Sequence, residues 1–512
     1  MTTDASPTTP IRPVSSTVAD IVRRSAGRFG NRTAIEFADR IWSYADLDAA
    51  VTGVARHLRE LGAVKGDRIA AYGKNSDLFA LLYLACARAG FIHVPVNFQL
   101  KGDELDYILG NSGAEVVFAD DDLIDAVTAT DNGAAAQVRA FTDILAPASA
   151  PDIAPVGDGE FDVYDDDVAQ LLYTSGTTSA PKGAVMTHRA LVHEYLSCLT
   201  SLDFAATDRV AHALPLYHSA QMHVFLIPNL AVGAHNIIVP APVPDQLLAL
   251  FEERQITSFF AAPTVWVAIA NSPELHTRNL DSLRKAYYGA SIMPGPVLAA
   301  LRERLPDLGF YNCFGQSELG PLCTVLRPDE HDEHPGSAGR PVLFVEARVV
   351  DAAGDDVADG DLGEILYRSP QLCSGYWERP EATAEAFDGD WFHSGDLVRR
   401  DAEGFVEVVD RVKDVINTGG VLVASRQVED AIFAMDGVAE VAVVGMADEK
   451  WIEAVSAFVV LRDDAGDIAE ADVIAHVKDR LAGFKVPKRV SFVSELPKNS
   501  AGKILKRSLR EA

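Results

Sequence analysis

The densest group of chemically useful side chains lies in one short stretch before residue 184. It contains, in order, Thr174, Ser175, Gly176, Thr177, Thr178 and Ser179, followed by Pro181, Lys182 and Gly183. Hydroxyls, backbone N–H groups and an ammonium are the groups that grip a polyphosphate, and glycine lets the backbone approach the phosphates closely. The stretch therefore predicts a phosphate-binding loop. The alternative is a surface loop that is merely rich in Ser, Thr and Gly.

The flanking elements favour the first interpretation. Residues 168–173 predict a short strand and residues 188–199 a helix, and nucleotides commonly bind an α/β sheet at such a junction. The Gly-x-x-x-x-Gly-Lys-Ser/Thr pattern of the P-loop is absent. The loop must therefore belong to another phosphate-binding class.

The stretch closely resembles the phosphate-binding signature of adenylate-forming enzymes, the superfamily of acyl-CoA synthetases, luciferases and peptide-synthetase adenylation domains. The common form is Thr-Ser-Gly-Ser/Thr-Thr-Gly-x-Pro-Lys-Gly, and Ser179 replaces its second glycine. At least five motifs of the superfamily follow one another over nearly the full chain. Within the superfamily, the sequence looks most like bacterial fatty-acyl-CoA synthetases.

A second motif, YNCFGQSELG at residues 311–320, resembles the superfamily's Tyr-Gly-x-Thr-Glu turn, with Ser317 in place of threonine. The resemblance assigns Glu318, together with Thr174, to Mg²⁺, which must screen the ATP phosphates during attack. Residues 329–334, DEHDEH, match no structural zinc spacing, so we expect a solvated charged loop there.

The remaining motifs lie toward the C-terminus. Asp396 and Arg411 match the residues that hydrogen-bond the ribose in the superfamily, and Lys413 matches its hinge. Lys503 matches the catalytic lysine of the closing motif. The nucleotide- and coenzyme-binding residues implied by the resemblance are Thr174, Ser175, Gly176, Thr177, Thr178, Lys182, Gly289, Ala290, Tyr311, Asn312, Phe314, Gly315, Gln316, Ser317, Asp396, Arg411, Gly419 and Gly420.

The segment ALPLYHSAQMHVFL at residues 213–226 carries the Pro-Leu-x-His element that lines the carboxylate pocket in the superfamily, and this gives His218 a catalytic role. Relatives that activate amino acids carry an aspartate in this segment. None is present here, which favours an uncharged acyl or aryl tail. The expected pocket residues are Tyr217, His218, Gln221, Trp266, Tyr288 and Gly289, with Gly289 leaving space beside the chain. Trp266, Tyr288, Gly289 and Ala290 are equally compatible with a place in the core.

Composition limits the class of protein. A chain of 512 residues, 48% of them apolar, predicts two or three domains, and a net charge of −29 argues against nucleic acid or an anionic membrane as a partner. Five cysteines without a Cys-x-x-Cys pair indicate reduced thiols in the cytoplasm. Residues 1–17 predict a flexible tail, and the longest apolar run, residues 78–87, is too short to span a bilayer.

Periodicity predicts an α/β fold. Helices over residues 42–61 and 78–89 alternate with strands over 68–71 and 91–96, which is typical of a parallel sheet covered by helices. Residues 119–167 predict surface connections, and Ser425 is expected to cap a helix. The superfamily fold implies a large N-terminal domain, residues 18–410, of two stacked α/β sheets plus a small β subdomain. A small mobile α+β C-terminal domain, residues 411–512, would turn about a hinge near Lys413.

Together these residues predict a two-step ligase. A carboxylate attacks the α-phosphorus of ATP and expels pyrophosphate, and a thiol then attacks the acyl adenylate. We expect ATP, Mg²⁺ and coenzyme A to be required, with a medium- or long-chain fatty acid as substrate. Four alternatives stay open: an aryl-acid ligase, an enzyme that loads an acyl carrier protein, a luciferase-like oxidative enzyme, and an inactive acyl-AMP-binding protein.

Overall fold

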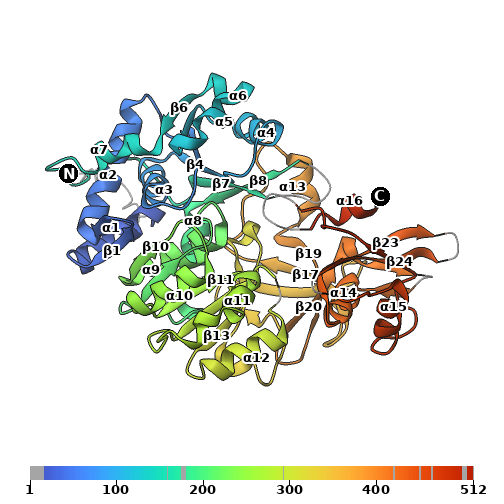
Figure 1. The fold of residues 1–512 in the computed structure, drawn as a ribbon. Coiled ribbons are helices and arrows are strands. Elements are labelled where there is room, and N and C mark those ends of the chain that lie inside the picture. Colours follow the sequence, from blue (N-terminus) through green and yellow to red (C-terminus); the bar gives the residue numbers. More distant parts are fainter. Residues whose placement is uncertain are drawn as a thin grey trace, which may run out of the picture.

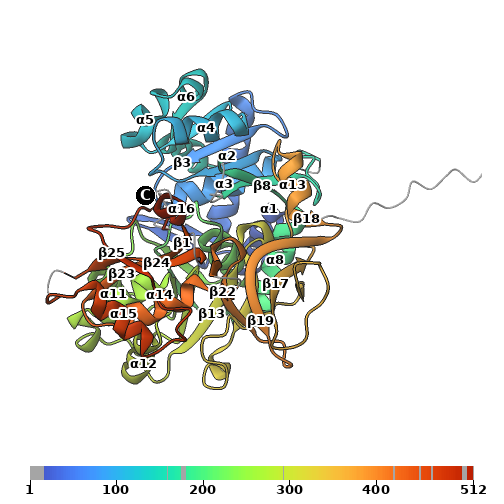
Figure 2. The ribbon, with the colours of Figure 1, turned by 90° about the vertical axis from the view of Figure 1, so that its right-hand side faces the viewer.

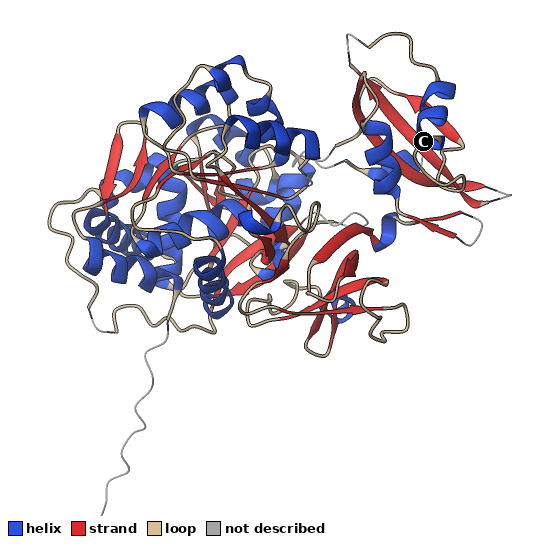
Figure 3. Ribbon diagram, turned by 90° about the horizontal axis from the view of Figure 1, so that it is seen from below, coloured by secondary structure: helices blue, strands red, loops and turns tan. Residues whose placement is uncertain are grey.

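The computed structural model shows a mixed α/β chain whose large N-terminal domain is followed by a smaller C-terminal domain (Figure 1). The C-terminal domain faces the viewer in Figure 2 and lies apart from the N-terminal domain, at the upper right, in Figure 3. The described residues are 16–157, 159–174, 180–291, 293–418, 421–448, 451–462, 465–498 and 504–510.

Two α/β sheets form the N-terminal domain. The first has nine strands in the order β15 (Arg340–Pro341), β14 (Leu322–Leu326), β13 (Gly309–Gly315), β12 (Lys285–Gly289), β11 (Ser258–Ala261), β9 (Arg209–His212), β10 (His235–Ile238), β1 (Thr33–Phe37) and β2 (Arg40–Ser43). The second has six strands in the order β6 (Gln137–Ala140), β5 (Val116–Ala119), β3 (Arg68–Tyr72), β4 (Ile92–Val96), β7 (Val168–Thr174) and β8 (Lys182–Thr187). From β13 to β1 and from β6 to β7, neighbouring strands are parallel.

Two smaller sheets complete the fold. An antiparallel sheet contains β16 (Glu346–Val350), β17 (Leu362–Arg368), β18 (Phe387–Asp388), β19 (Trp391–Arg400) and β20 (Val406–Arg411). The C-terminal sheet contains β21 (Ile416–Thr418), β22 (Val421–Val423), β23 (Val438–Asp448), β24 (Ile452–Leu461) and β25 (Arg489–Phe492). The predicted fold class is therefore confirmed, because two α/β sheets, a small β subdomain and an α+β domain are all present.

Helices cover the sheets. In the N-terminal domain they are α1 (Val18–Phe29), α2 (Tyr44–Glu60), α3 (Asp77–Ala89), α4 (Asp103–Ser112), α5 (Ile124–Thr128), α6 (Asp131–Ala135), α7 (Leu145–Ala148), α8 (His188–Ser201), α9 (Ile227–Val232), α10 (Pro244–Glu253), α11 (Pro263–Ala270), α12 (Gly295–Arg304) and α13 (Pro380–Ala386). In the C-terminal domain they are α14 (Ser425–Phe433), α15 (Glu470–Lys478) and α16 (Lys506–Arg510). Helix α3 contacts β1 of one large sheet and β3 and β4 of the other, so all of its residues are buried.

Two local predictions were wrong. Residues 119–167 do not form connections alone, because β6 extends the six-stranded sheet from β5 and the short helices α5, α6 and α7 surround it. The sequence of β6, QVRA, alternates polar and apolar residues, but over only four residues, which is too short a stretch to stand out from a loop. Ser425 is the first residue of α14 rather than its cap, and its hydroxyl donates to Asp410 at 2.8 Å.

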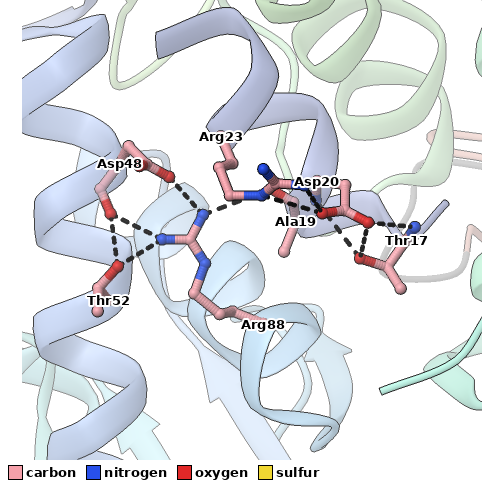
Figure 4. A network of polar contacts seen from close by, with 7 residues as sticks. All are labelled: Thr17, Ala19, Asp20, Arg23, Asp48, Thr52 and Arg88. Carbon is pink, nitrogen blue, oxygen red and sulfur yellow. Dashed lines mark hydrogen bonds and ion pairs between the residues drawn. The ribbon is translucent and has the colours of Figure 1, made fainter. Parts of the chain in front are cut away.

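A buried cation ties the first three helices together (Figure 4). Arg88, in the last turn of α3, has only 5% of its side chain exposed. Its guanidinium donates to the Asp48 carboxylate at 2.5 Å, to the Asp48 carbonyl at 2.7 Å and to Thr52 Oγ1 at 2.6 Å on α2. A longer bond of 3.4 Å reaches the carbonyl of Ala19 on α1. The network joins α1, α2 and α3 because the partners of Arg88 lie on the other two helices.

We expect Arg88→Leu to destabilise the N-terminal domain by about 3 kcal/mol, because removal of one partner leaves the Asp48 carboxylate uncompensated. Thermal unfolding followed by circular dichroism measures the loss. Arg23→Leu is the matched control, since Arg23 lies in the same network but is half exposed and pairs with the surface carboxylate of Asp20. Equal melting temperatures for the two variants would contradict a structural role for the Arg88 network.

Candidate active site

The predicted phosphate loop joins two antiparallel strands. Thr174 at the end of β7 pairs with Lys182 at the start of β8. Ser175, Gly176, Thr177, Thr178 and Ser179 lie outside the described residues. The sequence indicated β7 and α8 correctly but missed β8, which separates the loop from the helix. The loop thus leaves the carboxyl end of a parallel strand, where α/β sheets commonly bind nucleotides.

Glu318 meets the phosphate hairpin through side-chain contacts. Thr174 Oγ1 donates to Glu318 Oε1 at 3.1 Å, and the hydroxyl of Tyr376 donates to the same oxygen at 3.0 Å. The Lys182 ammonium lies 5.0 Å from the centroid of the Tyr376 ring. Glu318 is 8% exposed. A carboxylate and a hydroxyl that face each other supply the oxygen ligands Mg²⁺ prefers, so Glu318 and Thr174 fit the predicted metal role.

Glu194, a buried carboxyl on α8, supports the turn that carries Glu318. Oε1 of Glu194 accepts from the Leu322 backbone N–H at 3.0 Å, and Oε2 accepts from Gln371 Nε2 at 2.6 Å. The same Gln371 nitrogen also bonds the Leu319 carbonyl at 3.2 Å. Burial raises the pKa of Glu194 to about 8. Sequence analysis missed this residue, although a single glutamate among the apolar residues of a predicted helix was a detectable signal.

The predicted ribose-binding pair is assembled across two strands. Asp396 on β19 and Arg411 on β20 are register partners, and Arg411 donates to Asp396 Oδ1 at 2.6 Å. Gln316 Nε2 donates to Asp396 Oδ2 at 2.5 Å and to the carbonyl of Ser394 at 2.8 Å. Gln316 therefore connects the Glu318 turn directly to the ribose-binding pair. Ser317 Oγ lies 2.8 Å from Ser219 Oγ, next to the predicted acid-binding segment.

Other residues predicted to bind the nucleotide or coenzyme A have different surroundings. Ala290 is exposed and has a φ of 65°, at the end of β12. Tyr311 is buried, and its hydroxyl donates to Asp203 at 2.7 Å, while Asn312 donates to the Ser337 carbonyl at 2.9 Å. Phe314 is half-buried and Gly315 exposed at the end of β13.

Gly289 does not leave space beside the chain, so that prediction was wrong. A Cβ at residue 289 would lie 2.1 Å from the carbonyl oxygen of Cys313 on the neighbouring strand. Glycine is needed there because the backbones of β12 and β13 approach each other closely.

Only two of the residues predicted to form the acid-binding pocket, His218 and Tyr217, are accessible to solvent and lie side by side. His218 is exposed, has no side-chain hydrogen bond within the described part of the chain, and has a pKa lowered by the desolvating effect of nearby protein. The imidazole is therefore open to solvent yet partly desolvated by the protein around it. The ring of Tyr217 lies beside it, 5.4 Å away between centroids. Both can contact a bound acid.

Three other predicted pocket residues occupy the core, the alternative that the sequence left open for Trp266 and Tyr288. Gln221 donates to His212 and accepts from the backbone of Leu214. Trp266 is 1% exposed and donates to the carbonyl of Tyr287, and the Tyr288 hydroxyl bonds His331 at 3.0 Å.

His331 is an exception within the expected solvated loop at residues 329–334, because it is buried while Asp329, Asp332 and Glu333 are exposed. Its neighbours are paired with arginines: Glu330 with Arg340 and Asp332 with Arg302. Among the described residues, no group of three or more His, Cys, Asp or Glu side chains could hold a metal ion. A recess of about 250 Å³ next to Lys74 and another of about 300 Å³ next to Arg327 contain none of the predicted site residues.

The C-terminal domain brings the predicted hinge beside its last helix. Lys413 lies in a short 3₁₀ turn after β20. Arg510 on α16 donates to the Lys413 carbonyl at 3.3 Å and to Asp414 Oδ1 at 2.8 Å. Gly419, Gly420 and Lys503 lie outside the described residues. No described helix is long and apolar enough to cross a membrane.

Comparisons with known proteins agree with this architecture. Residues 22–377 match the family model "AMP-binding enzyme", and residues 427–503 match "AMP-binding enzyme C-terminal domain". Feruloyl-CoA synthase of an Amycolatopsis species is 36% identical over 487 residues, 95% of this chain and 97% of the relative. The long-chain-fatty-acid–CoA ligase FadD13 of Mycobacterium tuberculosis is 32% identical over 477 residues, 92% of each chain. ATP-bound MatB from Rhodopseudomonas palustris superposes with a TM-score of 0.87 at 32% identity, covering 96% of this chain and 98% of that one.

The chain therefore belongs to the AMP-binding, adenylate-forming enzyme family. It is an AMP-forming acyl-CoA synthetase, which converts an acid to an acyl adenylate and then to a coenzyme A thioester, and it uses ATP, Mg²⁺ and coenzyme A.

The pKa of Glu194 generates a pH test. Between pH 4.5 and about 8 the native state keeps a proton that the unfolded state releases, so this group's contribution to stability falls as pH rises. Glutamine cannot titrate. We expect the stability of Glu194→Gln relative to the wild type to rise steadily from pH 5 to pH 8. The difference in free energy of unfolding should grow by up to about 1.4 kcal/mol per pH unit, and the difference in melting temperature should follow it.

Glu160→Gln is the control for this experiment. The hydrogen bond from Arg56 lowers the pKa of Glu160 to about 2, so that carboxylate is ionised in both states throughout the range. Its difference from the wild type should be flat. A flat difference for Glu194→Gln as well would show that Glu194 is not protonated in the native protein.

Proposed function

We propose that the acid activated by this enzyme has an apolar, uncharged body, and that a medium- or long-chain fatty acid is the first candidate. The observation that carries this proposal is the absence of Asp and Glu from residues 213–226, the segment of His218. A buried substrate ammonium would need a carboxylate partner. Similarity to the FadD13 fatty-acid ligase supports the choice.

A second candidate is an aryl acid of the feruloyl type. The relative that favours it, feruloyl-CoA synthase, aligns with 95% of this chain. Ferulate and fatty acids share a carboxylate and a body without positive charge. The uncharged segment of residues 213–226 is therefore compatible with both classes.

The roles we propose for the residues follow from charge. Glu318 and Thr174 hold Mg²⁺, which supplies positive charge at the ATP phosphates. Lys182 and the loop before it hold the phosphates, while Asp396 and Arg411 bind the ribose. His218 contacts the acid, and Lys503 places an ammonium between the carboxylate and the α-phosphate. Most of the rate acceleration then comes from positioning and electrostatic stabilisation.

The substrate class can be tested by a panel of acids. We expect pyrophosphate release to be fastest with fatty acids. KM should fall roughly fourfold per added methylene until the acid-binding site is filled, since each buried methylene contributes about 0.8 kcal/mol. Faster turnover of ferulate than of every fatty acid would select the second candidate. An amino acid as the best substrate would refute both.

The same panel, supplied with a phosphopantetheinylated carrier protein in place of coenzyme A, compares the two acceptors. We expect coenzyme A to discharge the adenylate. Discharge by the carrier thiol alone would contradict this.

The role of Lys503 predicts a separation of the two half-reactions. Lys503→Ala should slow adenylate formation by about 10² to 10³, the effect of removing one group that stabilises transition-state charge. Thioester formation from a supplied acyl adenylate should stay near the wild-type rate. Lys498→Ala is a matched control, because that lysine pairs with Glu440 in the same domain. An equal loss in both half-reactions would refute the assignment.

A further inference from the structure

The segment between β17 and α13 connects the Glu318 turn to the phosphate hairpin. The Cys373 N–H donates to the carbonyl of Glu318 at 2.8 Å. The following residues pair with β8, the edge strand of its sheet, through Ser374 N–H to Val185 O and Val185 N–H to Gly375 O, both at 2.9 Å. One short segment therefore fixes two parts of the active site relative to each other.

Tyr376 lies at the centre of this connection. Its backbone bridges Ala184 on β8, and its backbone N–H donates to Thr383 Oγ1 on α13 at 2.9 Å. A Cβ on the preceding Gly375, which has a φ of 119°, would lie 2.7 Å from the Thr383 methyl group. The position of the tyrosine is thus determined from both sides of the segment.

The side chain of Tyr376 then reaches two groups with proposed roles in ATP binding. Its hydroxyl and that of Thr174 donate to the same oxygen of Glu318, Oε1, at 3.0 and 3.1 Å. Within the described residues no donor is recorded for Oε2. The face of the ring lies 5.0 Å from the Lys182 ammonium, a distance at which a cation is attracted by an aromatic ring.

We propose that Tyr376 is a positioning residue for adenylate formation, which orients the Glu318 carboxylate through its hydroxyl and the Lys182 ammonium through its ring. Two donors on one carboxylate oxygen restrict rotation of the carboxylate and leave the other oxygen to a cation. The proposal rests on the roles of Glu318 and Lys182 given above. It adds a residue to which the sequence motifs assigned no function.

Tyr376→Phe isolates the hydroxyl, because the ring stays. We expect adenylate formation, measured as pyrophosphate release in a single turnover, to slow about tenfold, and the Mg²⁺ concentration for half-maximal rate to rise at least threefold. Thioester formation from the supplied acyl adenylate of the best acid should not change. Tyr376→Leu also removes the aromatic ring that lies beside the Lys182 ammonium. It should weaken ATP binding several-fold more than Tyr376→Phe does.

Binding gives a readout independent of turnover. ATP with Mg²⁺ should raise the melting temperature of the wild type more than ATP with EDTA does, and this difference should shrink in Tyr376→Phe. Tyr72→Phe is the matched control, because its buried hydroxyl donates to the Leu100 carbonyl at 2.7 Å, away from Glu318 and Lys182. It should leave the Mg²⁺ dependence unchanged.

Two outcomes would overturn the proposal: a Mg²⁺ dependence of Tyr376→Phe equal to that of Tyr72→Phe, or equal losses in both half-reactions. Glu318→Gln separates this failure from failure of the underlying function. If Glu318→Gln alters the Mg²⁺ dependence and Tyr376→Phe does not, only the role of Tyr376 is refuted. If neither variant alters it, the metal role proposed for Glu318 is refuted with it.

Discussion

The active site depends on the contact between a carboxylate, Glu318, and two hydroxyls from distant parts of the chain. The protein carries a net charge of −29, so its overall field opposes the binding of an anion such as ATP. Local positive charge must therefore be placed accurately. Thr174 and Tyr376 hold one oxygen of the carboxylate, and Lys182 lies over the tyrosine ring. This arrangement brings the phosphate hairpin, the Glu318 turn and the segment before α13 to one point.

A buried polar network lies behind the phosphate hairpin and connects its strand to the core. Gln170, on the strand that leads into the phosphate loop, lies 2.9 Å from His93 and 2.6 Å from His223, and His223 continues to Tyr195 at 2.9 Å. Burial lowers the pKa of both histidines to about 3, so they are neutral at physiological pH. This neutral network links β4, β7, α8 and the acid-binding segment through buried hydrogen bonds without placing further charge beside the phosphate hairpin.

Other constraints act on the backbone. Gly289 is required by the close approach of β12 and β13, and Gly375 by the packing of α13. At both positions a Cβ atom would collide with a neighbouring residue. Gln316 joins the Glu318 turn to Asp396 and hence to Arg411. The side chains predicted to bind the nucleotide are consequently linked, from Thr174 on β7 through the turn of Gln316 and Glu318 to Asp396 and Arg411, immediately before the predicted hinge.

The sequence by itself determined the class of chemistry, the fold class and most of the long elements. Resemblance to the family's motifs located Thr174, Lys182, Glu318, Asp396 and Arg411, and periodicity located α2, α3 and β4 within a few residues. It could not show that Trp266 and Tyr288 are core residues, because an apolar aromatic side chain has the same pattern in a core and in a pocket. Only the tertiary structure decided the positions of Glu194, Gln371 and Tyr376. Their partners lie between 58 and 177 residues away in the chain, and no local pattern encodes a contact of that separation.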